Sequence, residues 1–262
     1  MTDQRAARRA ASLTRALCSG FRAAYDSLGY VVGASFVTFA ITVAVLALMG
    51  LLSVHAKQFR ALGVLLGLGT LAAWWLCAVG VTYYAWKTIT HQHPTPTDTF
   101  EGIRRLLRPA AALFVVDLII STVLFGDVAF FALAFKARGG AVLAGLTMVC
   151  AYLALMWSLM CVWHLPLLAA QLEMESGPSV RVILRKSFLL TADNPGFTVG
   201  LFVVIIAFAA LCVISAFGTA LVFAGTLAFL LTCSLRELFI KYGIVEEEPE
   251  VVEDKPWKLP ED

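Results

Sequence analysis

A single carboxylate interrupts a long apolar stretch of this sequence. Asp117 is the only charged residue between positions 109 and 126, and it lies about seven residues, or roughly 10 Å, into the apolar run 110–135. An ionised carboxylate is unfavourable in hydrocarbon, so such a residue is expected to face a polar cavity or a partner. We expect Asp117 to be neutral or paired and to lock helices together, with Arg236, His164 or a backbone amide as partner. The alternative is a proton or ion relay.

Two other polar residues lie in or beside apolar runs. Asp127 follows Gly126 roughly 26 Å into the same run, near the outer membrane interface, where a helix break or an exposed cap is expected. His164 lies near the inner headgroups at the end of the next run, so we expect a hydrogen-bonded interfacial histidine. Pro166 can end or kink that helix, which adds a hinge as an alternative.

The sequence predicts no metal or cofactor site. His91 and His93 form a His-x-His pair without a third ligand nearby, so exposed loop histidines are expected. Five of the six cysteines fall within apolar runs, where cysteine behaves as a small buried hydrophobe. No phosphate-binding loop, nucleophile elbow or zinc-binding helix motif occurs, so an enzyme assignment has no support in the sequence.

These residues are carried by a chain that is unusually apolar. Its 262 residues are 60% hydrophobic and 15% charged, whereas a soluble domain has about a quarter of its residues charged. About 20 apolar residues span a bilayer as a helix. Six runs satisfy that length: 30–54, 61–85, 110–135, 141–166, 197–217 and 219–235. We predict an all-α polytopic membrane protein of six transmembrane helices, arranged as three hairpins.

The basic residues predict the orientation. Sixteen of the 20 Lys and Arg residues fall in the segments on the same side as the N-terminus, which places both termini in the cytoplasm. A net charge of +2 does not suggest a nucleic-acid partner. We predict a membrane domain over 1–242, with an amphipathic leader over 1–28, and a disordered acidic cytoplasmic tail over 243–262.

Three basic amphipathic segments precede the hairpins and suggest a threefold repeat. They lie near 13–28, 100–108 and 180–188, and we expect each to be an elbow helix on the inner leaflet. Pro109 and the Asp193-Asn194-Pro195 triplet are predicted to break the second and third elbows from the spans that follow. The candidate interfacial basic residues are Arg104, Arg105, Arg108, Arg181, Arg185 and Lys186.

Small residues at helical spacing predict close helix packing. Gly63 and Gly67 form a Gly-x-x-x-Gly motif, and Ala220, Ala224 and Ala228 repeat a small residue every turn. Such faces serve packing within one chain or a homo-oligomer.

Segments around the second and third elbows resemble the YesL-like bacterial membrane proteins, a family defined by a domain of unknown function. The first is Tyr-Ala-Trp-Lys at 84–87, then Thr-Asp-Thr-Phe at 97–100 and Ile-Arg-Arg at 103–105. The second is Leu-Pro-Leu-Leu at 165–168, then the basic helix 184–190 and Asn-Pro at 194–195. The longer Arg- and Ala-rich N-terminus departs from the family pattern. The resemblance implies a bacterial cytoplasmic membrane protein, sometimes encoded beside carbohydrate uptake systems, and carries over no catalytic residue.

We therefore expect a non-enzymatic membrane protein that assists or regulates a membrane transport complex, with the bilayer and that complex as its partners. A transporter in its own right is the first alternative and would need a polar path. A lipid-modifying membrane enzyme is the second and would need convergent His, Asp or Glu at one depth.

Overall fold

The described part of the chain is a set of α-helices. The computed structural model describes residues 11–53, 60–90, 92–172, 177–215 and 217–245, and no strand occurs among them. The helices are α1 (Leu13–Asp26), α2 (Leu28–Ser53), α3 (Arg60–Ile89), α4 (Thr97–Arg138), α5 (Ala141–Gln171), α6 (Val180–Asp193), α7 (Pro195–Ser215), α8 (Phe217–Leu221) and α9 (Phe223–Tyr242). Within these ranges six helices, α2, α3, α4, α5, α7 and α9, are long and apolar enough to cross a membrane. This confirms the all-α, six-span prediction.

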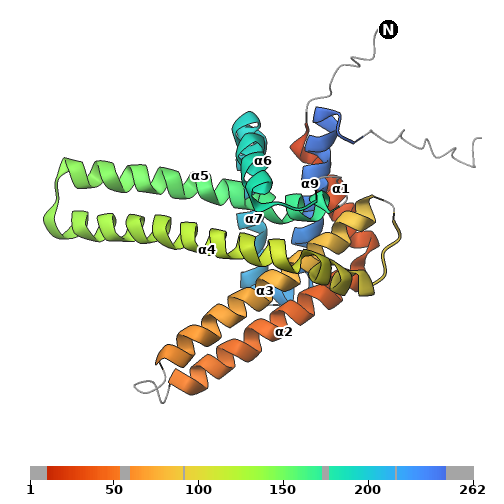
Figure 1. The fold of residues 1–262 in the computed structure, drawn as a ribbon, viewed down its shortest axis with the longest axis horizontal. Coiled ribbons are helices and arrows are strands. Elements are labelled where there is room, and N and C mark those ends of the chain that lie inside the picture. Colours follow the sequence, from red (N-terminus) through yellow and green to blue (C-terminus); the bar gives the residue numbers. More distant parts are fainter. Residues whose placement is uncertain (1–10, 54–59, 91, 173–176, 216, 246–262) are drawn as a thin grey trace, which may run out of the picture.

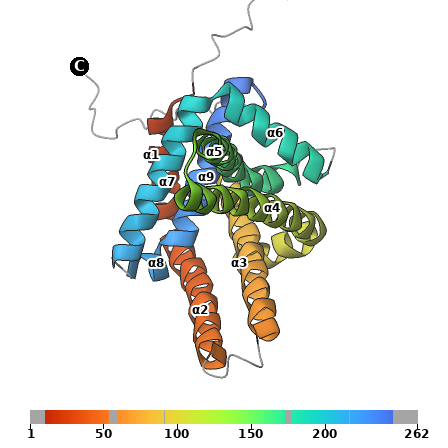
Figure 2. The ribbon, with the colours of Figure 1, turned by 90° about the vertical axis from the view of Figure 1, so that its left-hand side faces the viewer.

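The six long helices form three hairpins that point in different directions from a common hub. The hairpins are α2 with α3, α4 with α5, and α7 with α9 through the short α8 (Figure 1). After a quarter turn, α4 and α5 point at the viewer while α2 and α3 run downward (Figure 2). The outer parts of the hairpins carry exposed apolar side chains such as Phe130 and Leu211. These surfaces are suited to lipid.

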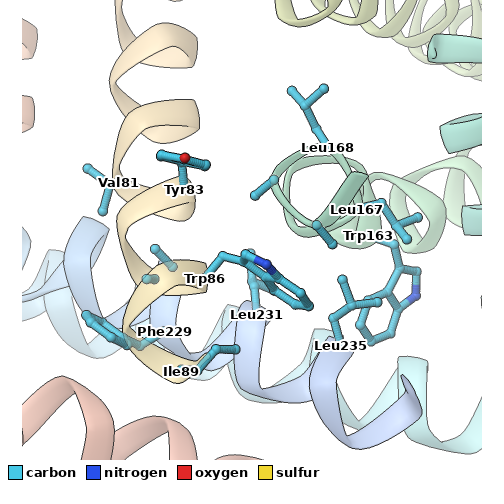
Figure 3. Packing of buried hydrophobic residues seen from close by; sticks show 14 of the residues in the cluster. Val81, Tyr83, Trp86, Ile89, Trp163, Leu167, Leu168, Phe229, Leu231 and Leu235 are labelled. Atoms are coloured by element: carbon cyan, nitrogen blue, oxygen red, sulfur yellow. The ribbon is translucent and has the colours of Figure 1, made fainter. Parts of the chain in front are cut away.

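The hub is built around α9, the most enclosed of the six long helices. Its apolar residues Leu231 and Leu235 lie beside Trp86 of α3 and Trp163 of α5 (Figure 3). Trp163 and Leu235 have no exposed surface. The core therefore lies where the hairpins meet, at the ends of the spans nearest the elbows.

Glycines bring the helices of the hub close together. A Cβ on Gly102 of α4 would lie 2.4 Å from the ring of Tyr83 on α3, and one on Gly225 of α9 would lie 2.7 Å from the Val31 backbone. Gly63, by contrast, has no neighbour within 4 Å of such a Cβ. Among the described residues, no other helix packs closely against Gly63, so this end of the predicted Gly-x-x-x-Gly motif is not a packing face.

The elbows differ from the prediction in one respect. Pro109 lies inside α4, which runs unbroken from the second elbow into the span. Proline removes only one helical hydrogen bond, and Leu106 and Ala110 on either side are fully buried and anchor the helix. Pro166 likewise lies inside α5, which does not end there. The third elbow is separate as predicted, since α6 ends at Asp193 and Pro195 begins α7.

The last span extends beyond its predicted apolar run. The run was expected to end at 235, yet α9 continues to Tyr242, and its charged residue Glu237 has partners on the N-terminal segment. Glu237 accepts a hydrogen bond from the Ser12 N–H at 3.1 Å and pairs with Arg15 at 2.8 Å. The first elbow, α1, thus packs along α9 through its small-residue face at Ala16, Gly20 and Ala24.

Candidate functional site

Three polar side chains from three different helices meet beside the hub. Asp117 comes from α4, His164 from α5 and Ser187 from α6. His164 and Ser187 have no exposed surface, and Asp117 is 7% exposed. We call this set the Asp–His–Ser chain.

The imidazole of His164 bridges the other two residues. Its Nδ1 lies 3.1 Å from Asp117 Oδ2 and 3.0 Å from Oδ1, while its Nε2 lies 3.2 Å from Ser187 Oγ. Ser187 Oγ in turn donates to the Leu184 carbonyl at 2.9 Å. The structure thus pairs Asp117 with His164, one of the three partners considered from the sequence. His164 is hydrogen-bonded and has no exposed surface, because α6 packs against α5 at this point.

The hydrogen bonds are consistent with one pattern of protons. If Ser187 donates its only proton to the Leu184 carbonyl, its oxygen accepts from His164 and Nε2 carries a hydrogen. One proton is then shared between Nδ1 and Asp117, either as imidazolium with carboxylate or as neutral imidazole with carboxylic acid. Both arrangements have zero net charge, which suits an apolar interior.

Aromatic and sulfur groups surround the imidazole. The Trp157 ring lies edge-on to His164 with centroids 5.5 Å apart, and its Nε1 donates to Ser121 Oγ at 3.0 Å. Cys161 lies one turn before His164 on α5. Its sulfur, an Asp117 oxygen and a His164 nitrogen all lie within 4.8 Å of one another.

The Asp–His–Ser order matches that of serine hydrolases, but the surroundings do not match their chemistry. A nucleophilic serine needs substrate access and nearby N–H groups to stabilise an oxyanion. Ser187 is fully buried, and its hydroxyl proton is directed to a carbonyl. It also lies within α6, where the backbone N–H groups are used by the helix. The Asp–His–Ser chain therefore connects α4, α5 and α6 through polar contacts.

The other predicted site residues lie apart from the Asp–His–Ser chain. Asp127 is exposed on α4, and the helix continues past it, so the predicted helix break is wrong. His93 is exposed, and His91 lies outside the described residues. Five of the candidate basic residues are exposed on α4 and α6: Arg104, Arg105, Arg108, Arg181 and Arg185. The sixth, Lys186 on α6, is partly covered.

A second polar cluster joins the third elbow to the end of α9. Asn194 donates to the Tyr242 hydroxyl at 2.6 Å and accepts from Lys241, and Tyr242 donates to Asp193. The Tyr242 hydrogen bond lowers the pKa of Asp193 below its ordinary value. An open apolar groove of about 350 Å³, lined in part by Leu189 and Phe239, lies beside this cluster. The cluster fixes the turn at which α6 leads into α7.

Sequence reasoning missed Ser187. It lies on the buried face of α6 with Ile183 and Leu190, but a serine in a basic amphipathic helix is ordinarily assigned to the polar face. Its spacing of four and three residues from those two apolar positions is the signal that places it on the packed side.

Comparisons with protein-family models, with curated proteins and with solved structures find no match to this chain.

Proposed function

We propose that this chain is a non-enzymatic accessory or regulatory component of a membrane transport system in the bacterial cytoplasmic membrane, with both termini in the cytoplasm. The bias of Lys and Arg toward one side of the spans supports the orientation. The resemblance to the YesL-like proteins supports the bacterial setting and the link to uptake of small solutes such as carbohydrates.

The enclosure of the Asp–His–Ser chain is the observation that carries the non-enzymatic part of the proposal. Its histidine and serine have no exposed surface, so a substrate has no route to them without movement of α6. The same contacts hold α6 to α4 and α5 through buried polar groups. Such bonds are directional and fix the position of the helix more closely than apolar contact alone.

The opposite face of α6 provides a surface for a partner. Arg181 and Arg185 are exposed there, and Phe188 and Leu189 are 52% and 53% exposed. Mixed basic and aromatic surface of this kind suits contact with a second membrane protein or with anionic headgroups at the inner leaflet. Because α6 is held to α4 and α5, a partner that binds this surface can shift α6 and, with it, the helices of the hub.

A transporter is the second candidate function. It is favoured by the Asp117–His164 pair, in which one proton is shared inside a span. Loss of transport in an Asp117→Asn variant that folds normally would favour it over the accessory role.

Site-specific photo-crosslinking in native membranes tests the proposal. A benzophenone amino acid at Phe188 should form an adduct with one membrane transport subunit, identified by mass spectrometry. The matched control is Phe130, an exposed aromatic on the outer part of α4, where only lipid adducts are expected. Lipid adducts alone at both positions would contradict the accessory role.

A further inference from the structure

Asp117, Cys161 and His164 bring three different metal-binding atoms together. Cys161 and His164 are three residues apart on α5 and so share a helix face, and Asp117 approaches that face from α4. Their sulfur, nitrogen and oxygen atoms lie within 4.8 Å of one another. Sequence spacing alone predicts no such site, because Asp117 is distant in the chain from the other two.

The imidazole is already oriented as a ligand. Its Nε2 faces the Ser187 hydroxyl, which can accept the Nε2–H, and its Nδ1 faces Asp117. Nδ1 therefore presents a lone pair beside Asp117 once the proton shared with that carboxyl group has left. Histidines that bind metals usually donate their other ring N–H to such a partner, which fixes the tautomer and the ring. Ser187 thus has the role of an orienting residue.

Asp117 offers a second independent sign of a ligand. Its Oδ1 is buried and, although 3.0 Å from Nδ1, makes no hydrogen bond of acceptable geometry to any described residue. A buried carboxylate oxygen without a hydrogen bond is unfavourable unless something else coordinates it.

We propose that Asp117, Cys161 and His164 bind one divalent transition-metal ion, with Zn²⁺ the best match. Zinc takes thiolate, imidazole and carboxylate ligands, and three protein ligands leave one position open. Mg²⁺ and Ca²⁺ prefer oxygen ligands alone. A thiolate and a carboxylate with a divalent ion give a neutral site, which the apolar surroundings favour.

Binding releases two protons and involves no redox change. One proton leaves the Cys161 thiol, and the other is the proton shared between Asp117 and His164. The bound ion joins α4 to α5 directly and, through Ser187, secures α6. This inference concerns metal binding and does not depend on the proposed role in transport.

Metal binding by the purified full-length chain tests the proposal. After equilibration with zinc and dialysis, about one zinc ion per chain is expected by elemental analysis. Co²⁺ should give the visible bands of a tetrahedral site and a thiolate-to-cobalt charge-transfer band. Ser187→Ala, which keeps all three ligands, should weaken binding by about 10- to 100-fold.

Cysteine variants make the test specific. Cys161→Ser should lose the charge-transfer band, whereas Cys150→Ser on the same helix should keep it. A variant that retains Cys161 as its only cysteine should also keep it, which covers the case in which Cys161→Ser does not fold. Wild-type protein without bound metal, or a band that persists in Cys161→Ser, would overturn the proposal.

Discussion

Replacing Asp117 distinguishes the two proton arrangements of the Asp–His–Ser chain. In chelator-treated protein, Asp117→Leu leaves the fully buried Nδ1 of His164 without a partner. An unsatisfied buried group costs about 1–3 kcal/mol of unfolding free energy. Asp117→Asn supplies an amide N–H that can donate to the Nδ1 lone pair, so with a neutral imidazole the loss should be below about 1 kcal/mol.

The imidazolium arrangement predicts a smaller difference between the two variants. Removing one partner of a buried ion pair costs about 3–5 kcal/mol, and Asn would then be nearly as damaging as Leu. Equilibrium unfolding in mixed micelles measures both variants, with Asp127→Leu as the control on the exposed face of α4. We expect Leu to destabilise more than Asn and the Asp127 control to be neutral or stabilising. An Asp117→Leu variant as stable as wild type would refute the buried pairing itself.

Three further predictions follow from the packing, the charges and the third elbow. Gly102→Ala should lower the free energy of unfolding by about 1–3 kcal/mol, because its Cβ would overlap the Tyr83 ring. Gly126→Ala, in open space on the same helix, is the control and should raise the free energy of unfolding by about 0.5–1 kcal/mol. Equilibrium unfolding measures both variants. Because its pKa is lowered, Asp193 stabilises the fold above its ordinary pKa of 3.8, and this contribution is lost as the pH falls below that value. Asp193→Asn should therefore remove part of the acid dependence of the unfolding midpoint, and an unchanged pH profile would argue against the Tyr242 contact. A reporter enzyme that is active only outside the cytoplasm should be active when fused after Lys57 or Gly139. It should be silent when fused after Arg9, Thr95, Gly177 or Asp262. Activity of the fusion after Asp262 would contradict the proposed orientation.

The spans and the three hairpins could be predicted from the sequence because lipid imposes a minimum apolar length. The elbow at Asn194 and Pro195 could also be predicted, since proline favours the first turn of a new helix. The continuity of α4 through Pro109 could not, because it depends on burial of Leu106 and Ala110 by other helices.

The candidate site could be predicted only in part. The apolar sequence around Asp117 predicts that its carboxyl group needs a polar partner, and His164 was one of the three candidate partners. Local sequence does not show that α6 packs over His164, so its burial and the role of Ser187 emerge only from tertiary structure. The predicted acidic tail falls almost entirely in 246–262, outside the described residues.

Hydrogen exchange of α6 in lipid nanodiscs tests most directly the claim that the Asp–His–Ser chain holds this helix to the spans. Its amides should be protected in wild-type protein and should exchange faster in Ser187→Ala and Asp117→Leu, while the amides of α9 keep their protection. Protection of α6 that is unchanged in both variants would contradict the claim.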